Sequence, residues 1–355
     1  MGVSIFAFIV VLGVLIFVHE LGHFLVARFF GVGIEKFSLG FGPRIVGKTV
    51  GITDYRISAI PLGGYVKMVG EEPDADIDPT DIPISFTHKN VFKRIMIVAA
   101  GPLSNFLLAV IIFFGIYQIL GVTILKPSVG EIIENSPAYT SGLKKDDLIV
   151  AIDGRKVSTW EDMSEIITAS NGTTLAISVL RDNTTRVLSV TPKPKTFKNI
   201  FNEDIDRYVI GIKASGESFK EDLSVFQSFS ESIQQTYTIT VLTIKGIVKL
   251  FQGSISPKTL AGPIMIAQMA GEQAKEGVTN LVFFIALISI NLAIINFLPI
   301  PVLDGGHLLF FFIEAAIGHP VSIRIREIAQ QAGIAVLLLL MIYVFYNDIE
   351  RLLFS

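Results

Sequence analysis

The chain lacks cysteine entirely, and only 17% of its 355 residues are charged. Without cysteine there are no disulfide bonds and no thiolate metal ligands, so a transition-metal site would have to use the 5 histidines and the carboxylates. A soluble domain normally carries about 25% charged residues, which makes this chain unusually poor in charge. The net charge is -3, and no basic run alternates with aromatic residues. This composition argues against a nucleic-acid partner and favours a membrane protein.

The apolar residues are concentrated in four long blocks. Roughly 20 apolar residues in a helix are needed to span a bilayer, because the backbone must satisfy its own hydrogen bonds there. The first block has no basic start and no small-residue cleavage site, and its polar residues lie inside it, so it is not a secretory signal. We therefore predict a polytopic α-helical membrane protein with about four transmembrane helices, in the blocks 3–30, 95–124, 281–299 and 334–345.

Lysine and arginine near the span ends predict the orientation, because cytoplasmic loops are enriched in these residues. The connection between the first two blocks and the connection before the fourth carry most of them, namely Arg28, Lys36, Lys89, Lys93, Arg94, Arg324 and Arg326. Segments 31–91 and 300–330 are therefore predicted to be cytoplasmic. Both termini and the long 125–278 segment are predicted to lie outside.

The outer segment changes character along its length. Short alternating runs at 148–152, 175–179 and 187–190, with turns at Asp153-Gly154 and Asn171-Gly172 and helical spacing over 161–170, predict a small β-rich unit. A polar linker is expected next, followed by an amphipathic helix over 224–252, and the cytoplasmic stretch 44–69 also alternates as strands do. The predicted divisions are 1–30 (first span), 31–91 (cytoplasmic loop with a β segment), 92–124 (second span), 125–195 (β-rich unit), 196–278 (linker and amphipathic helix), 279–307 (third span) and 308–355 (loop and fourth span).

The first block contains the sequence His19-Glu20-Leu21-Gly22-His23, an H-E-x-x-H pattern. Residues four apart lie on one helix face, so both imidazoles can bind one zinc ion while Glu20 flanks it and can accept a proton from an activated water. Ionisable residues inside a lipid-spanning helix are costly and indicate function. The alternatives are hydrogen bonds to neighbouring helices or a proton or ion pathway.

A catalytic zinc site needs a third protein ligand. The stretch 296–307 stands out, because Pro299 and Pro301 end the regular helix of the third block and place the following residues at the depth of the two histidines. The residues alone leave Asp304 and His307 open as the third ligand. The full set of candidates is Asp304, His307, His88, His319 and Glu314.

Four motifs in this order resemble the site-2 protease family, and within it the bacterial regulator-of-sigma-E proteases. The resemblance covers nearly the whole chain. It rests on residues 19–23 (HELGH), 61–68 (PLGGYVKM), 101–105 (GPLSN) and 296–305 (NFLPIPVLDG).

The resemblance implies an intramembrane zinc metalloprotease that carries out regulated intramembrane proteolysis. It implies that Asp304 is the third zinc ligand beside His19 and His23, that Glu20 is the catalytic base and that Asn296 supports the substrate. It also implies a multi-pass protein of the bacterial inner membrane. Its substrates would be single-pass membrane proteins, such as anti-sigma factors after a first cleavage, and signal-peptide remnants.

The β-rich unit resembles a PDZ domain on the residues Ser136-Pro137-Ala138, Gly142-Leu143 and 149–154. Two features depart from the pattern. The usual Gly-Asp before the central strand is Asp146-Asp147 here, and the familiar sigma-E proteases carry two such domains where this chain has one. The unit is expected to bind substrate, with a spacer as the alternative.

The rival function is a catalytically silent membrane scaffold whose PDZ domain recruits partners, and a transporter is a third possibility. A scaffold has no reason to keep two histidines, a glutamate and an aspartate in lipid. The sequence therefore favours the enzyme.

Overall fold

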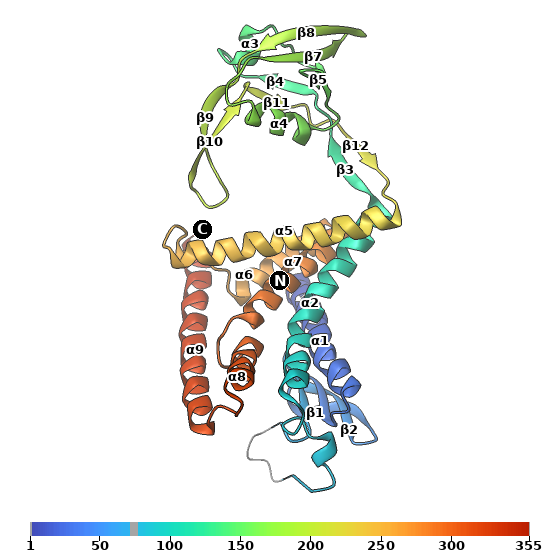
Figure 1. Ribbon diagram of the computed structural model, residues 1–355, viewed down its shortest axis with the longest axis vertical. Coiled ribbons are helices and arrows are strands. Elements are labelled where there is room, and N and C mark those ends of the chain that lie inside the picture. The colour runs from blue at the N-terminus through green and yellow to red at the C-terminus, as the bar shows by residue number, and fades with distance from the viewer. Residues whose placement is uncertain (1, 72–76, 355) are drawn as a thin grey trace. The chain divides into compact units, whose positions relative to one another are not determined.

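The computed structural model describes residues 2–71 and 77–354. The chain forms two compact units (Figure 1). Unit 1 comprises Met1–Ile116, Phe229–Ile247 and Ser256–Ser355, and unit 2 comprises Tyr117–Ser228 and Val248–Ile255.

Among the described residues, four helices are long and apolar enough to cross a membrane. They are α1 (Gly2–Phe29), α2 (Val91–Leu120), α7 (Val278–Phe297) and α9 (Ile323–Phe354). The predicted number of spans is confirmed by this result, and the chain is a polytopic membrane protein. The other helices of the chain are η1 (Ile82–Ile84), α3 (Pro137–Thr140), α4 (Trp160–Ala169), α5 (Val225–Phe251), η2 (Pro257–Thr259), α6 (Pro263–Glu276) and α8 (Asp304–Ile317).

The chain breaks after the third span, where Pro299 and Pro301 were expected to end the helix. Helix α7 ends at Phe297, and Asp304 begins the separate helix α8. Proline at 299 and 301 removes backbone donors between the two helices. The fourth helix, α9, is longer than the predicted block 334–345. Its first turns carry charged residues, which lower the local hydropathy, so the apolar block did not include them.

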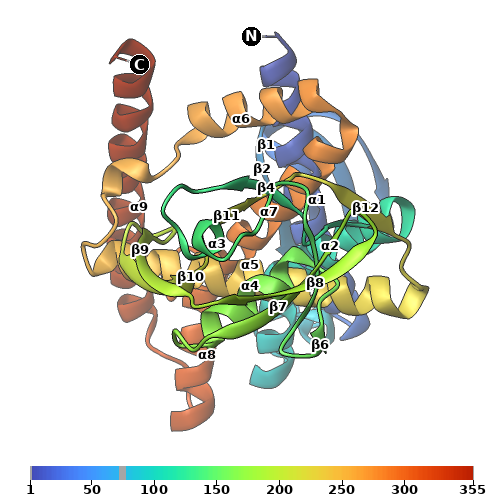
Figure 2. The same cartoon turned by 90° about the horizontal axis from the view of Figure 1, so that it is seen from above.

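Glycine allows α1 and α2 to pack closely, and both views show the two helices side by side (Figures 1 and 2). A Cβ atom on Gly22 of α1 would lie 2.2 Å from Ser104 Oγ and 2.4 Å from the Ala100 carbonyl oxygen of α2. No side chain fits in that space. The close approach brings the histidines of α1 against the backbone of α2.

A long β-hairpin follows α1, formed by β1 (Ile34–Val50) and β2 (Thr53–Met68). The strands are antiparallel, with Ile34 opposite Met68 and Val50 opposite Thr53. The hairpin begins ten residues before the predicted stretch 44–69. Phe37 and Val66 are buried at its base, whereas Ile45 near its tip is 70% exposed. The base therefore packs into the core of unit 1 beside α1.

Unit 2 is β-rich, as predicted. Its main sheet has the strand order β6-β5-β7-β8, and α4 packs on one face of it through Met163 and Ile167 (Figure 1). Asp153 and Gly154 have φ values of 49° and 78°, and Asn171 and Gly172 have 50° and 84°. Such left-handed pairs match the predicted turns. The strands of unit 2 are β3 (Val122–Leu125), β4 (Val129–Ile132), β5 (Leu148–Ile152), β6 (Arg155–Lys156), β7 (Leu175–Arg181), β8 (Thr184–Val190), β9 (Lys193–Lys198), β10 (Asp204–Val209), β11 (Ile212–Ala214) and β12 (Ser218–Glu221).

The predicted linker after residue 195 was wrong. This stretch forms strands: β9 pairs with β10, β11 returns to pair with β4, and β12 pairs with β3. Ile210 is 1% exposed and belongs to the core of unit 2. The strands are short and mostly polar, and the partners of β11 and β12 are distant in sequence, so alternation did not reveal them. The predicted helix 224–252 is confirmed as α5, which Ser224 and Gln227 cap reciprocally.

The atypical Asp146-Asp147 pair has a structural explanation. Asp146 adopts φ = 69°, the left-handed conformation that glycine takes most easily. Asp147 is completely buried and accepts hydrogen bonds from Arg181 Nε at 2.6 Å and from the Lys144 amide at 2.8 Å. The turn is thus formed without glycine.

Candidate metal centre

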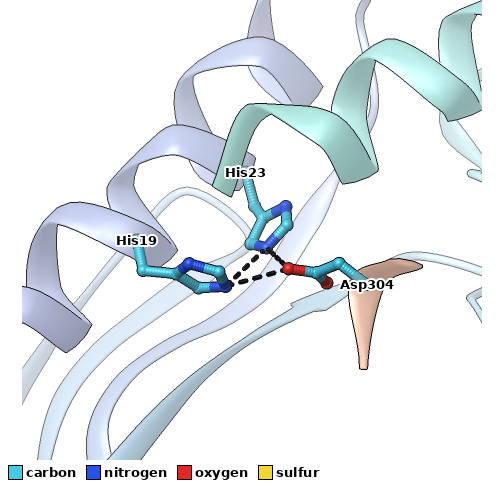
Figure 3. A group of neighbouring side chains, drawn as sticks. All are labelled: His19, His23 and Asp304. Atoms are coloured by element: carbon cyan, nitrogen blue, oxygen red, sulfur yellow. Dashed lines mark hydrogen bonds and ion pairs between the residues drawn. The ribbon is translucent and has the colours of Figure 1, made fainter. Parts of the chain in front are cut away.

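Three potential metal ligands converge in unit 1, two from α1 and one from the start of α8 (Figure 3). His19 Nε2 lies 3.2 Å from His23 Nε2 and 3.1 Å from Asp304 Oδ2. His23 Nε2 lies 3.5 Å from the same oxygen. The two imidazoles and the carboxylate point toward one another (Figure 3).

The spacing of these atoms fits a tetrahedral zinc ion. Zinc binds nitrogen and oxygen at about 2.0–2.1 Å, which makes the edge of its ligand tetrahedron about 3.3 Å. The three observed separations of 3.1, 3.2 and 3.5 Å bracket this edge. Two histidines and one carboxylate also form a donor set used by catalytic zinc, with the fourth position left for water or substrate.

The backbone of α2 selects the tautomer of the neutral His23 ring. Its Nδ1 donates a hydrogen bond to the Ile97 carbonyl oxygen over 2.9 Å, so in the neutral ring Nε2 carries the lone pair. Metal-bound histidines usually donate their other ring nitrogen in this way. Among the described residues, no group makes a hydrogen bond to the buried Asp304 Oδ2. The lone pairs of His23 Nε2 and Asp304 Oδ2 therefore face one another. This arrangement is favourable when a cation lies between the two atoms and binds both.

Asn105 of α2 lies next to the other imidazole. Its amide is fully buried, Nδ2 lies 3.4 Å from His19 Nδ1, and Oδ1 has no hydrogen-bond partner in the described part of the chain. A half turn of the amide exchanges the positions of its nitrogen and oxygen without changing its shape. In the turned orientation Oδ1 accepts a hydrogen bond from His19 Nδ1–H, which leaves the lone pair of His19 Nε2 facing Asp304.

Gly101 makes room for both rings. A Cβ atom there would lie 2.2 Å from His23 Nε2 and 2.9 Å from His19 Cε1. The backbone of α2 therefore forms one wall of the centre, and only glycine leaves space for the imidazoles against it.

Two glycines place the aspartate. A Cβ atom on Gly305 would lie 2.2 Å from the Leu298 carbonyl oxygen, and one on Gly306 would lie 2.4 Å from that of Ile300. The first turn of α8 thus packs directly on the loop that follows α7. Asp304 is the first residue of α8, where the helix dipole stabilises a carboxylate.

Glu20 and Asn296 lie beside this group. Glu20, His19, His23 and Asp304 line a cavity of about 720 Å³. Glu20, His19 and Asp304 also line a second cavity of about 430 Å³, to which Asn296 contributes. Strand β2 passes close to Glu20, since a Cβ atom on Gly64 would lie 3.2 Å from Glu20 Cγ. The group therefore combines three potential ligand atoms, a neighbouring carboxylate and an adjoining cavity.

The other candidates for the third ligand do not join the group. His307 lines the larger cavity but is not among the three converging residues. His88 Nδ1 lies 3.0 Å from Ser85 Oγ, and His319 Nδ1 lies 3.3 Å from the Pro320 carbonyl oxygen. Glu314 forms an ion pair with Arg94.

Sequence reasoning assigned no role to Asn105 or to the Ile97 carbonyl group. Asn105 was marked only as part of a recurring motif in the second span. The available signal was a polar amide in a lipid-spanning helix, which must find a partner inside the protein.

Comparison with known proteins identifies the family. Residues 7–340 match the family model of peptidase family M50. A protein of Campylobacter jejuni named as a candidate zinc metalloprotease is 37% identical over 99% of this chain and 95% of its own length. The zinc metalloprotease RasP of Geobacillus kaustophilus is 32% identical over 98% of each chain, and the regulator of sigma-W protease RasP of Bacillus subtilis is 31% identical over 98% of this chain and 99% of its own. The chain therefore belongs to peptidase family M50, the site-2 proteases, and is a membrane-embedded zinc metalloprotease.

Proposed function

We propose that this zinc metalloprotease cleaves single-pass membrane proteins within or at the edge of the bilayer, with His19, His23 and Asp304 holding the zinc ion. The observation that carries this proposal is that the three ligand atoms lie 3.1–3.5 Å from one another and that two of them belong to α1, a helix long enough to span a membrane. When bound, zinc supplies Lewis acidity for the scissile carbonyl group and for water.

The chain's own residues supply the remaining steps. Glu20 flanks the three ligands in both cavities, where it accepts the proton of the attacking water and later delivers it to the leaving amine. Asn296 lines the smaller cavity with Glu20, and its amide holds the substrate backbone there. The buried rings of His19 and His23 keep their orientation through the wall formed by α2.

The substrate must be extended at the scissile bond. A helix keeps its carbonyl groups in i to i−4 hydrogen bonds, so a helical substrate unwinds locally before attack. In the described chain β2 pairs with β1 alone, and it runs beside Glu20. We expect the unwound substrate to pair with β2 as an added strand. Proline substitutions along β2 that left cleavage unchanged would contradict this role.

The substrate class is an anti-sigma factor already shortened by another protease, with signal-peptide remnants as a second class. The name of the Bacillus subtilis relative, regulator of sigma-W protease, supports the first class. The distribution of lysine and arginine supports an inner-membrane protein whose 31–91 and 300–330 segments face the cytoplasm. The active site then lies toward the cytoplasmic side.

Unit 2 acts as a single PDZ-like module on the extracytoplasmic side. Its β-rich sheet with one flanking helix supports this likeness, as do the motifs over 136–154. PDZ domains capture C-terminal carboxylates and extended strands, which suits a substrate that ends outside the membrane after a first cut.

One experiment tests the proposal. Purified protein and its Glu20→Gln variant are incubated in detergent with a single-span substrate, and cleavage and bound zinc are both measured. We expect the variant to retain zinc and lose cleavage, with the wild-type cut mapped by mass spectrometry to the transmembrane segment. Equal cleavage by both proteins would exclude Glu20 as the base, and a cut far outside the segment would exclude intramembrane proteolysis.

A further inference from the structure

A cluster of three charged side chains lies in unit 1, apart from the metal ligands. Arg94 of α2, Glu314 of α8 and Arg326 of α9 meet there, and their side chains are 9%, 11% and 17% exposed. Two guanidinium groups share a single carboxylate. The cluster therefore carries a surplus positive charge in a largely buried place, which costs free energy unless an anion compensates it.

Arg94 is fully engaged in this cluster. Its two terminal nitrogens bind the two oxygens of Glu314, its Nε donates to the Lys89 carbonyl oxygen over 3.1 Å, and its guanidinium carbon lies 4.9 Å from the centre of the Phe311 ring. A bidentate pair of this kind uses both oxygens of the carboxylate. Both carboxylate oxygens of Glu314 therefore accept hydrogen bonds from Arg94.

Arg326, unlike Arg94, does not form a hydrogen-bonded pair with Glu314. Its Nη2 lies 3.8 Å from Glu314 Oε2, which is beyond hydrogen-bond distance. Its Nε and Nη2 are buried, and within residues 2–71 and 77–354 neither atom has a hydrogen-bond partner. Glu327 is adjacent but exposed, and it forms no ion pair with Arg326 in this part of the chain. These two buried nitrogens can therefore donate hydrogen bonds to an acceptor on a ligand.

The position of Arg326 indicates the acceptor. Arg94 and Arg326 line the same cavity of about 720 Å³ that contains His19, Glu20, His23 and Asp304. A ligand of Arg326 therefore shares the cavity with the reacting peptide. A guanidinium group recognises a planar carboxylate better than any other group that a peptide carries.

We propose that Arg326, held in place beside the Arg94–Glu314 pair, is a carboxylate-binding subsite for the substrate chain. The carboxylate is either an acidic side chain near the scissile bond or the α-carboxylate that hydrolysis creates. This inference rests on the proposed function only in that the cavity receives a peptide. It makes Arg326 a determinant of specificity or of product retention, and not a structural tie between helices.

The first test measures binding without cleavage. The probes are two fluorescent, N-acetylated apolar peptides that differ only at the C-terminus, one a free carboxylate and the other a carboxamide. They are titrated into Glu20→Gln protein in detergent, alone and combined with Arg326→Gln, Arg326→Lys or Arg324→Gln. Arg324 is the matched control, because it is on the same helix and exposed.

If the subsite binds the new α-carboxylate, that peptide binds on the order of tenfold more tightly than the carboxamide, as one charge-assisted hydrogen bond provides. The preference disappears with Arg326→Gln, is partly kept with Arg326→Lys and is unchanged with Arg324→Gln. A preference that survives Arg326→Gln would assign the carboxylate to the metal and overturn the proposal.

The second test uses cleavage to separate the two sources. A single-span substrate carries one Glu or one Gln at successive positions on either side of the scissile bond. A position where Glu raises kcat/KM about tenfold over Gln, only when Arg326 is present, identifies an acidic side chain as the ligand. No preference in either test, measured with the wild-type Arg326, overturns the subsite whether or not the variants fold. Failure to cleave any single-span substrate would instead refute the proposed function, and the peptide titration would still report on Arg326.

Discussion

His19 Nε2 and Asp304 Oδ2 lie 3.1 Å apart, although the two residues come from α1 and α8, far apart in the sequence. The contact depends on the break between α7 and α8, which turns the chain so that the first residue of α8 meets α1. His23 Nε2 completes the triangle at 3.2 Å from His19 Nε2.

Asp304 is the proposed third zinc ligand, and its replacement tests that role. We expect Asp304→Ala to weaken zinc binding by more than about hundredfold, beyond the 10–100-fold loss typical of residues that only support a ligand. The matched control is His307→Gln, because His307 lines the same cavity but does not join the triangle. Competition with a zinc chelator measures both affinities. Loss of zinc in His307→Gln with full retention in Asp304→Ala would reverse the assignment.

The buried amide of Asn105 orients His19. Asn105→Ala leaves His19 Nδ1 without its partner, so the imidazole can rotate or change tautomer, and zinc affinity should fall about 10–100-fold. The neighbouring Ser104→Ala is the control and should bind zinc normally. The same chelator competition gives the result. Equal affinity in the two variants would show that Asn105 has no part in positioning His19.

A substitution at Gly101 tests whether the backbone of α2 must lie directly against the two imidazoles. Gly101→Ala places a methyl group 2.2 Å from His23 Nε2, so the ring must move and zinc and activity should both be lost. Gly115→Ala is on the same helix, and nothing lies within 4 Å of the added methyl group. That variant should keep wild-type zinc content and cleavage, because alanine is a better helix former than glycine. Zinc content and cleavage are measured for both variants. Wild-type zinc content in Gly101→Ala would show that the imidazoles do not need the space that glycine leaves.

Unit 2 should lose stability in acid through a single ion pair. Burial tends to raise the pKa of Asp147, but hydrogen bonds from Arg181 and from the Lys144 amide hold this pKa below its usual value. Because the pKa is lower in the folded state, the pair stabilises unit 2 fully above pH about 4, the ordinary pKa of aspartate, and the contribution is lost as the pH falls through the folded pKa.

Hydrogen exchange of β5 and β7 amides in the full-length protein, corrected for intrinsic rates, measures this loss between pH 6 and pH 2.5. We expect Asp147→Asn to reduce protection at pH 6 by about 2 kcal/mol and to flatten the pH dependence. Arg155→Gln on exposed β6 is the control and should behave as wild type. An unchanged pH profile in Asp147→Asn would exclude the pair as the cause.

Features that depend on local sequence were predictable. The apolar blocks revealed the number of spans, and the four-residue spacing of His19 and His23 predicted convergent imidazoles. Features that depend on distant contacts were not. The strands β11 and β12 are short and polar, and they pair with β4 and β3, which are distant in sequence. The residues alone left Asp304 and His307 open, because the choice depends on where α8 begins. The proposed role of Arg326 was not predictable for the same reason. It depends on the packing of Arg326 beside Arg94 and Glu314, which are distant in sequence.

The most direct test of the metal centre is X-ray absorption at the zinc edge of the purified protein. We predict one zinc ion per chain in a four-coordinate shell of nitrogen and oxygen at about 2.0–2.2 Å, with two imidazoles, and with one oxygen neighbour lost in Asp304→Ala. A shell with three or more imidazoles, or a zinc signal that persists unchanged when His19 and His23 are both replaced, would contradict the account.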